Sequence, residues 1–264
     1  MKKYAFPLIM WLLFEAIAIT LWLALDNLFY LFNFSYIGLC LAFGIAFYIK
    51  KVKYARHMVQ LAVGLYMLVY LGILSRENMQ IEGFWYYLFL GVFEAAVIHY
   101  SIAKIFGPLL FGRGWCGYAC WTAMVLDLLP YKVPRRPRKN IAFIRYIVFA
   151  LSLLFVGALF LFHAPHLDRI MFWSFIIGNA LYYAVGTVLA FVFKDNRAFC
   201  KYICPITVFL KPASYFALLR VKNHTDRCIS CGRCVSACQY SAILKTQRPC
   251  EKGCPAKAIS MGPD

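Results

Sequence analysis

The chain has 264 residues, of which 63% are hydrophobic, 18% are aromatic and only 15% are charged. Its mean hydropathy of +0.68 is that of a membrane protein and excludes an ordinary soluble core. The formal net charge of +17 suits either nucleic-acid binding or the cytoplasmic rim of a membrane protein, and the apolar composition favours the rim.

Six apolar windows predict an all-α integral membrane protein with about six transmembrane helices. Most of them reach the ~20 residues that a helix needs to cross a hydrocarbon core of ~30 Å. The third is shorter, and flanking Lys and Arg side chains can extend from its ends to the interface. The first follows Met-Lys-Lys, and we expect it to stay as an anchor because no small-residue cleavage site follows it. The windows are Phe6–Leu25, Leu28–Ile49, Val59–Leu74, Phe84–Phe106, Ile141–Phe162 and Ile170–Phe193.

Basic residues are distributed unevenly between the two sides of these six spans. One side carries 24 of the 28 Lys and Arg residues, whereas the other carries only Arg76 and Arg169. By the positive-inside rule both termini are cytoplasmic. We therefore expect a multi-pass protein of a bacterial or archaeal cytoplasmic (inner) membrane with no nucleic-acid partner. The basic segments are 1–5, 50–58, 107–140 and 194–264.

The sequence predicts two connections between the early helices and a polar fourth helix. Helices one and two should meet at a tight Asp26–Asn27 turn, and Arg76–Gly83 should form a short polar outer loop. The fourth helix carries Glu94, His99 and Lys104. Because ionisable groups are costly inside a bilayer, we expect a functional role for Glu94 and His99, with a satisfied interhelical hydrogen bond as the alternative.

Two C-x3-C pairs form an internal repeat with an offset of 84 residues. Cys116 and Cys120 stand in one copy, Cys200 and Cys204 in the other. Cysteines at i and i+4 share a face if the segment is helical, and Pro205 suits the first turn of a helix. Two such faces supply four thiolates for a [4Fe-4S] cluster, and nearby Arg residues would offset its negative charge. The alternative is two unliganded thiol pairs packed at the interface. The aligned neighbours are Arg113 with Arg197, Trp115 with Phe199 and Tyr118 with Tyr202.

A second set of cysteines follows near the C-terminus. Three thiols spaced by two residues on a loop that contains a glycine are typical of a ferredoxin-type [4Fe-4S] site, whereas zinc sites usually have C-x2-C units set further apart. Cys254, which precedes Pro255, is the expected fourth ligand, and Cys238 is the alternative. A second complete run is missing, so Cys238 and Cys250 can be remnants of a lost cluster or extra metal ligands. The run comprises Cys228, Cys231, Cys234 and Cys238.

The cysteine sets predict two domains and two [4Fe-4S] clusters, with ten motif cysteines in the cytoplasm. Residues 1–210 should form a six-helix transmembrane domain with the two cytoplasmic C-x3-C motifs. Residues 211–264 should form a small cytoplasmic ferredoxin-like segment. The lone Cys40 in the second helix is predicted to be a small apolar filler.

These motifs resemble those of the membrane-bound ferredoxin family over about residues 84–258. That family includes the quinol-dehydrogenase membrane subunit of periplasmic nitrate reduction, the nitrous-oxide-reductase membrane ferredoxin and an oxidase-assembly membrane ferredoxin. Two features differ: Trp121 stands where the family has Pro, and many relatives carry two complete ferredoxin runs. The matching motifs are Gly112-Arg-Gly-Trp-Cys116-x3-Cys120, Arg197-x2-Cys200-x3-Cys204-Pro205 and the run from Cys228.

We expect the chain to be the electron-transfer component of an oxidoreductase system. Electrons would pass between a redox partner protein, the clusters and a membrane carrier, which the resemblance implies is quinone. Gly-rich nucleotide fingerprints are absent from the sequence, so NAD or flavin in a standard domain is not expected. Two alternatives remain: an assembly or maturation factor that reduces a metal or cofactor for a respiratory enzyme, and a redox-sensing regulatory subunit.

The membrane end of the route depends on two histidines near the cytoplasmic ends of helices three and four. His57 and His99 could line a quinone pocket in which His99 or Glu94 exchanges protons, since imidazole titrates near neutral pH. A haem bound by both histidines ranks lower because no second His pair supports it. Two interfacial histidines bonded to lipid or backbone are a further alternative.

Overall fold

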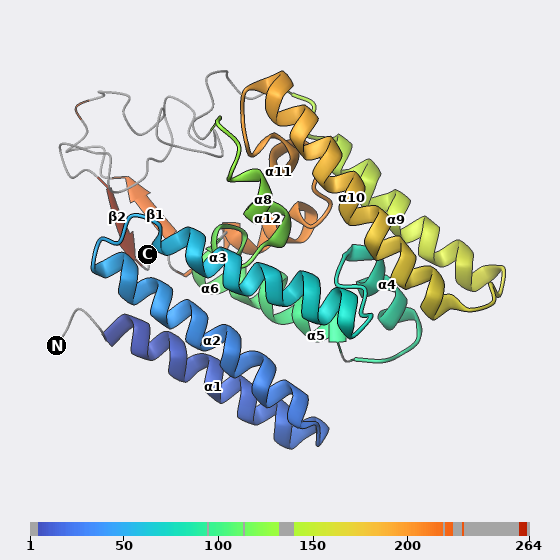
Figure 1. Cartoon of the computed structure of the whole chain (residues 1–264), viewed down its shortest axis with the longest axis horizontal. Coiled ribbons are helices and arrows are strands. Elements are labelled where there is room, and N and C mark those ends of the chain that lie inside the picture. Colours follow the sequence, from blue (N-terminus) through green and yellow to red (C-terminus); the bar gives the residue numbers. More distant parts are fainter. Residues whose placement is uncertain are drawn as a thin grey trace. The chain divides into compact units, whose positions relative to one another are not determined.

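The computed structural model describes residues 5–93, 95–112, 114–131, 140–218, 220–223, 229 and 259–262. Within this part of the chain the structure is helical except for one two-stranded antiparallel sheet (Figure 1). Five helices among the described residues are long and apolar enough to cross a membrane, which is compatible with a multi-pass membrane protein. They are α1 (Ala5–Leu25), α2 (Leu28–Ile49), α3 (Ala55–Leu65) with the π-helix η2 (Tyr66–Leu74), α9 (Ile144–Leu161) and α10 (Leu167–Phe193).

The chain divides into two compact units. The first comprises residues 1–67 and 116–124, and the second comprises residues 68–115 and 125–264. The first unit therefore contains one C-x3-C motif, and the second contains the other.

In the first unit, α1 and α2 form a hairpin with the predicted turn. Only Asp26 and Asn27 separate the two helices. The Oδ1 of Asn27 accepts a hydrogen bond from the backbone N–H of Phe29 at 3.0 Å, as an N-cap residue does. Deeper in the hairpin, Ser35 Oγ donates to Glu15 Oε2 at 2.7 Å, so this acidic side chain in α1 has a hydrogen-bond partner in α2.

In the second unit, the predicted uninterrupted span Phe84–Phe106 is wrong. The helix ends at Phe89, and Gly91 in the following turn has φ 71°. The next apolar helical stretch, Ala96–Leu110, is only about 22 Å long at 1.5 Å per residue, less than the ~30 Å of a hydrocarbon core. The helices here are α4 (Ile81–Phe89), α5 (Ala95–Tyr100), the π-helix η3 (Ser101–Phe106) and α6 (Gly107–Phe111).

The segment before α4 is buried rather than a polar loop in solvent, which corrects the expectation for Arg76–Gly83. Asn78 and Gln80 are each only 2% exposed. The Nδ2 of Asn78 donates to the carbonyl oxygen of Met171 at 3.0 Å and to Ser174 Oγ at 2.9 Å, both in α10. Gly83 permits this fold because a Cβ at that position would overlap the backbone oxygen of Asn78.

The segment packs first along α10, away from its first residue Leu167, and α4 then packs along α9 toward the C-terminal end of that helix. Gln80 packs against Gly178, which lies about 16 Å along α10 from Leu167. From there α4 runs toward the loop that joins α9 to α10, since Trp85 donates to Ser152 and Phe89 packs on Phe160 near the end of α9. Residues 75–89 thus form a re-entrant segment whose tip, at Gln80–Glu82, lies beside the middle of α10.

The C-terminal part contains the short sheet. Strand β1 (Arg220–Asn223) pairs with β2 (Ile259–Gly262) in antiparallel register, with Asn223 opposite Ile259. The described part of the C-terminal segment therefore contains strands as well as helix. The predicted boundary between residues 210 and 211 falls inside α12 (Thr207–Tyr215).

Candidate iron-sulfur site

The two C-x3-C motifs fold alike, which confirms the internal repeat. Cys116 lies at the third position of α7 (Gly114–Tyr118), and Cys200 lies at the third position of α11 (Ala198–Tyr202). The bounds of these five-residue helices differ by the same 84 residues as the motifs. In each copy the second cysteine, Cys120 or Cys204, stands two residues beyond the helix end.

The expected i and i+4 placement on one helical face is therefore wrong, because each short helix ends before its second cysteine. Instead, that cysteine leads into the next helix. The carbonyl oxygen of Cys120 accepts from the backbone N–H of Met124 at 2.9 Å in α8 (Trp121–Leu126). The carbonyl oxygen of Cys204 accepts from Thr207 Oγ1 at 2.6 Å.

The residue after the second cysteine distinguishes the two copies. Trp121 begins α8 directly after Cys120, whereas Pro205 lies in a turn and α12 begins only at Thr207. Pro205 is thus not in the first turn of a helix, contrary to the expectation.

The donor set of each motif suits half of a [4Fe-4S] site. Cys116, Cys120, Cys200 and Cys204 are all half-buried. Within either unit, the described residues contain no group of three or more His, Cys, Asp or Glu side chains that could bind a metal ion. Since a [4Fe-4S] cluster takes four protein ligands, neither pair can serve it alone.

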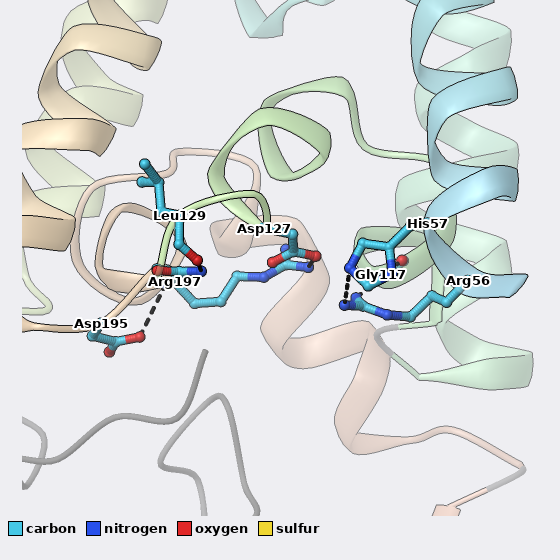
Figure 2. A network of polar contacts seen from close by, with 8 residues as sticks. Arg56, His57, Gly117, Asp127, Leu129, Asp195 and Arg197 are labelled. Carbon is cyan, nitrogen blue, oxygen red and sulfur yellow. Dashed lines mark hydrogen bonds and ion pairs between the residues drawn. The ribbon is translucent and has the colours of Figure 1, made fainter. Parts of the chain in front are cut away.

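In the first unit, α3 lies along the first motif. Arg56, Gln60 and Gly64 are spaced by four residues and so share one face of α3. Arg56 Nη1 donates to the carbonyl oxygen of Gly117 at 3.5 Å (Figure 2). One turn beyond Gln60, a Cβ on Gly64 would lie 3.3 Å from the Cα of Trp121.

Gln60 lies between these two contacts and is buried. Its side chain is 1% exposed, and its Nε2 has no hydrogen-bond partner among the described residues. Beside it, Arg56 Nη2 is 3.5 Å from Nε2 of His57. Burial raises the pKa of the Tyr118 phenol, against the opposing effect of Arg56, so Tyr118 stays neutral near pH 7 and Arg56 is the charged member of that pair.

In the second unit, two buried ion pairs flank Cys200. Arg197 Nη2 is 2.5 Å from Asp127 Oδ2, and Lys201 Nζ is 2.5 Å from Asp195 Oδ2. Asp195 Oδ1 also accepts from the backbone N–H of Arg197 at 3.0 Å, as Figure 2 shows. Each cation beside Cys200 thus has its own carboxylate, and the expectation that Arg residues offset the cluster charge stays a prediction.

Hydrogen bonds join the segment after α8 to the segment before α11. The Asn196 side chain donates to the carbonyl oxygen of Leu129 at 2.6 Å and accepts from the backbone N–H of Tyr131 at 2.8 Å. The backbone N–H of Asn196 donates to the Tyr131 carbonyl at 3.0 Å. With the Asp127–Arg197 pair, residues 127–131 and 195–197 form a clamp, and we use that name for them below.

Several predicted site residues are not brought together by the described structure. Glu94, Arg113 and the cysteines Cys228, Cys231, Cys234, Cys238, Cys250 and Cys254 lie outside the described residues. His99 is buried in α5 at 4% exposure, and His57 lies in α3 of the first unit. The haem or quinone pairing of these two histidines stays a prediction.

Sequence reasoning missed the polar residues that surround Cys200. Two carboxylates and the amide of Asn196 form its network, and Arg145 Nη2 donates to the carbonyl oxygen of Lys201. One signal was available: the chain has only 11 acidic residues, and Asp195 stands two residues before Arg197. The pairing with Asp127 had no local signal because the two residues are 70 positions apart.

Family models match both sets of cysteines. A model described as a 4Fe-4S binding domain matches residues 101–140 and 170–223, so each matched segment contains one C-x3-C motif. Another model with the same description matches residues 221–244, which include Cys228 to Cys238 and stop before Cys250. The matches indicate 4Fe-4S cluster binding and support an iron-sulfur protein of the ferredoxin type.

The chain is also similar to two proteins of Methanocaldococcus jannaschii. Uncharacterized protein MJ0750 is 23% identical over 188 residues, which cover 63% of this chain and 78% of that protein. Uncharacterized protein MJ0749 is 22% identical over 178 residues, which cover 63% of this chain and 67% of that protein. No solved structure is significantly similar to the chain.

Proposed function

We propose that the chain is a membrane electron-transfer protein with two [4Fe-4S] sites, which passes electrons between a redox partner protein and quinone in the membrane. Cys116, Cys120, Cys200 and Cys204 provide the first site. Cys228, Cys231, Cys234 and Cys254 provide the second. A cluster bound at such a site takes up and releases single electrons.

The match of one 4Fe-4S family model to both motifs is the observation that carries the first site. Cys120 precedes α8, and the clamp residue Asp127 follows α8 directly. On the other side, Arg197 directly precedes α11, which contains Cys200. The clamp holds the flank of the second motif within its own unit, and a single shared site is supported by the family-model match, because each motif alone supplies two thiols and the cluster needs four.

The quinone assignment rests on different support. Five long apolar helices are compatible with a membrane location, where a lipid-soluble carrier is accessible. The choice of quinone among such carriers follows from the family resemblance. In this proposal the paired thiols follow helices that would cross the bilayer, so the cluster would lie near its surface.

Iron and sulfide analysis of the anaerobically purified protein tests the two sites. We expect about eight irons per chain for two clusters of four, and about four after Cys116→Ser or Cys200→Ser. Cys40→Ser is the matched control, since Cys40 lies in α2 outside both motifs, and it should keep the wild-type iron content.

Two results would contradict the proposal. Full iron content in Cys116→Ser and Cys200→Ser would remove the shared site. Clusters that dithionite reduces but that a short-chain quinol never reduces would remove quinone as the carrier and would favour the maturation-factor alternative.

A further inference from the structure

The tip of the re-entrant segment contains two buried polar atoms that the protein leaves unsatisfied. Gln80 Nε2 and Glu82 Oε2 are buried, and neither has a hydrogen-bond partner among the described residues. Gln80 as a whole is 2% exposed. A buried polar atom without a partner destabilises the folded protein, so an unsatisfied donor and acceptor at one tip suggest that something binds them.

The surroundings of the tip are aromatic and apolar. Ile81, Phe84 and Tyr100 belong to one buried cluster, against which Trp85 and Phe209 pack. The Phe84 and Tyr100 rings stack with their centroids 5.2 Å apart. A partner for the tip should therefore be an apolar, ring-shaped molecule with polar oxygens, because such a molecule matches both the aromatic walls and the unsatisfied atoms.

The tip is also connected to the second C-x3-C motif. Gln80 packs against Gly178 in α10, and Tyr182 stands one turn further along the same helix. The centroid of the Tyr182 ring lies 4.9 Å from that of Phe199, the residue directly before Cys200 in α11. One face of α10 thus contacts the tip at Gly178 and the helix of the second motif at Tyr182.

We propose that the Gln80–Glu82 tip binds the oxygen-bearing head of a quinone or hydroquinone and that Glu82 exchanges a proton with it. The inference rests on the proposed function, since it names the site at which the membrane carrier binds. Gln80 Nε2 donates a hydrogen bond to a carbonyl oxygen of the ring. In the proton step, an O–H bond of the hydroquinone breaks, an O–H bond forms on the Glu82 carboxylate, and the ring keeps its electrons.

This site differs from the one expected from sequence, which stays an untested prediction. There, Glu94 and His99 were the candidates because they lie within an apolar window. The structure instead puts Glu82, which stands just before that window, beside the middle of α10. An acidic residue beside the middle of a membrane-spanning helix is a functional candidate, because the bilayer offers no water to its charged form.

Photolabelling of the intact wild-type protein tests the binding site without using activity. A photoreactive benzoquinone analogue should label residues 75–89 or the Gly178–Tyr182 part of α10, and excess decylquinol should compete with the label. Gln80→Leu should lower labelling at least tenfold, because it removes the only proposed donor to the ring oxygen. Competable label confined to other segments would overturn the site.

Infrared difference spectra and rates test the proton step. Binding of decylquinol should change a carboxyl C=O band that is absent in Glu82→Gln and present in the control Glu77→Gln, which alters an acid of the same segment. Quinol-dependent cluster reduction should slow on the order of 100-fold in Glu82→Gln, with partial recovery in Glu82→Asp and with unchanged iron content.

The two proposals fail in different ways. Wild-type quinol rates and an unchanged carboxyl band in Glu82→Gln would overturn the role of Glu82 and leave electron transfer intact. If quinol fails to reduce the wild-type clusters while dithionite succeeds, the proposed quinone function itself is wrong.

Discussion

At the scale of single residues, the second motif depends on charges that are buried in pairs. Asp127 and Arg197 are 5% and 2% exposed, so each needs the other to compensate its loss of water. Replacing a whole buried ion pair by apolar groups is often neutral, but removing one partner leaves an unpaired charge. The two kinds of substitution should therefore differ sharply.

We expect Asp127→Asn to lower the free energy of unfolding by about 3–5 kcal/mol, because Arg197 then stays buried without its carboxylate. The double variant Asp127→Leu with Arg197→Met should recover much of this loss. Thermal unfolding in detergent provides the measurement, with iron content as a second readout. A double variant as unstable as the sum of the two single changes would show that the pair contributes no coupling.

A second residue-scale prediction concerns Gln60. Its buried amide lies on the face of α3 that contacts the first motif, and hydrogen bonds to cluster sulfurs raise a reduction potential. Gln60→Leu should therefore make the midpoint potential of one cluster more negative in an EPR-monitored titration. Asn33→Leu is the matched control, because Asn33 is a fully buried amide of α2. Equal potentials in wild type and Gln60→Leu would show that the amide does not contact the cluster.

At the scale of elements, the re-entrant segment depends on a close backbone approach. Gly83 in α4 lies against the backbone of Asn78, which cannot move aside as the end of a flexible side chain can. The hydrogen bonds of Asn78 to α10 hold that backbone in place. A methyl group at Gly83 must therefore displace either the segment or α4.

We expect Gly83→Ala to destabilise the protein by about 1–3 kcal/mol through overpacking. Gly157→Ala is the matched control, because a Cβ at Gly157 in α9 meets no atom within 4 Å and Ala favours a helix over Gly by about 1 kcal/mol. Melting temperatures of the two variants in detergent should thus move in opposite directions. Equal or higher stability of Gly83→Ala would show that the segment does not pack as described.

At the scale of the whole molecule, the number of crossings decides where the termini lie. The five long apolar helices among the described residues would by themselves put the two ends on opposite sides of a membrane, whereas the distribution of basic residues predicts both ends in the cytoplasm. The helix count and the distribution of basic residues agree only if the shorter run Ala96–Leu110 also crosses the membrane. Its length of about 22 Å requires local thinning of the bilayer or the support of neighbouring helices.

Reporter fusions test this arrangement. A fluorescent reporter that folds only in the cytoplasm should be active at the C-terminus, and an alkaline phosphatase that works only outside should be active in the α9–α10 loop at residues 162–166. We expect this pattern because Lys and Arg are concentrated on the side of the membrane that carries the C-terminus, and the positive-inside rule makes that side cytoplasmic. The reversed pattern of activities would mean that Ala96–Leu110 does not cross.

The sequence by itself determined the features that depend on local pattern. The hydropathy windows predicted α2 with the bounds that the structure shows and placed α1, α9 and α10 within a few residues, because a bilayer imposes length and apolarity on every crossing helix. The repeat of 84 residues and the cysteine spacing predicted the two matching motifs. The hydropathy and cysteine-spacing signals lie in neighbouring residues, and the repeat is visible by comparing two short stretches of the sequence.

The tertiary structure alone decided the break after Phe89, the burial of Asn78 and Gln80, and the pairing of Asp127 with Arg197. A hydropathy average cannot distinguish a crossing helix from a re-entrant one, since both are apolar and only contacts with α9 and α10 separate them. The clamp joins residues about 70 positions apart, and no local pattern encodes such a contact. Glu82 became a candidate for the same reason, because its partially buried position beside α10 is set by contacts with residues distant in sequence.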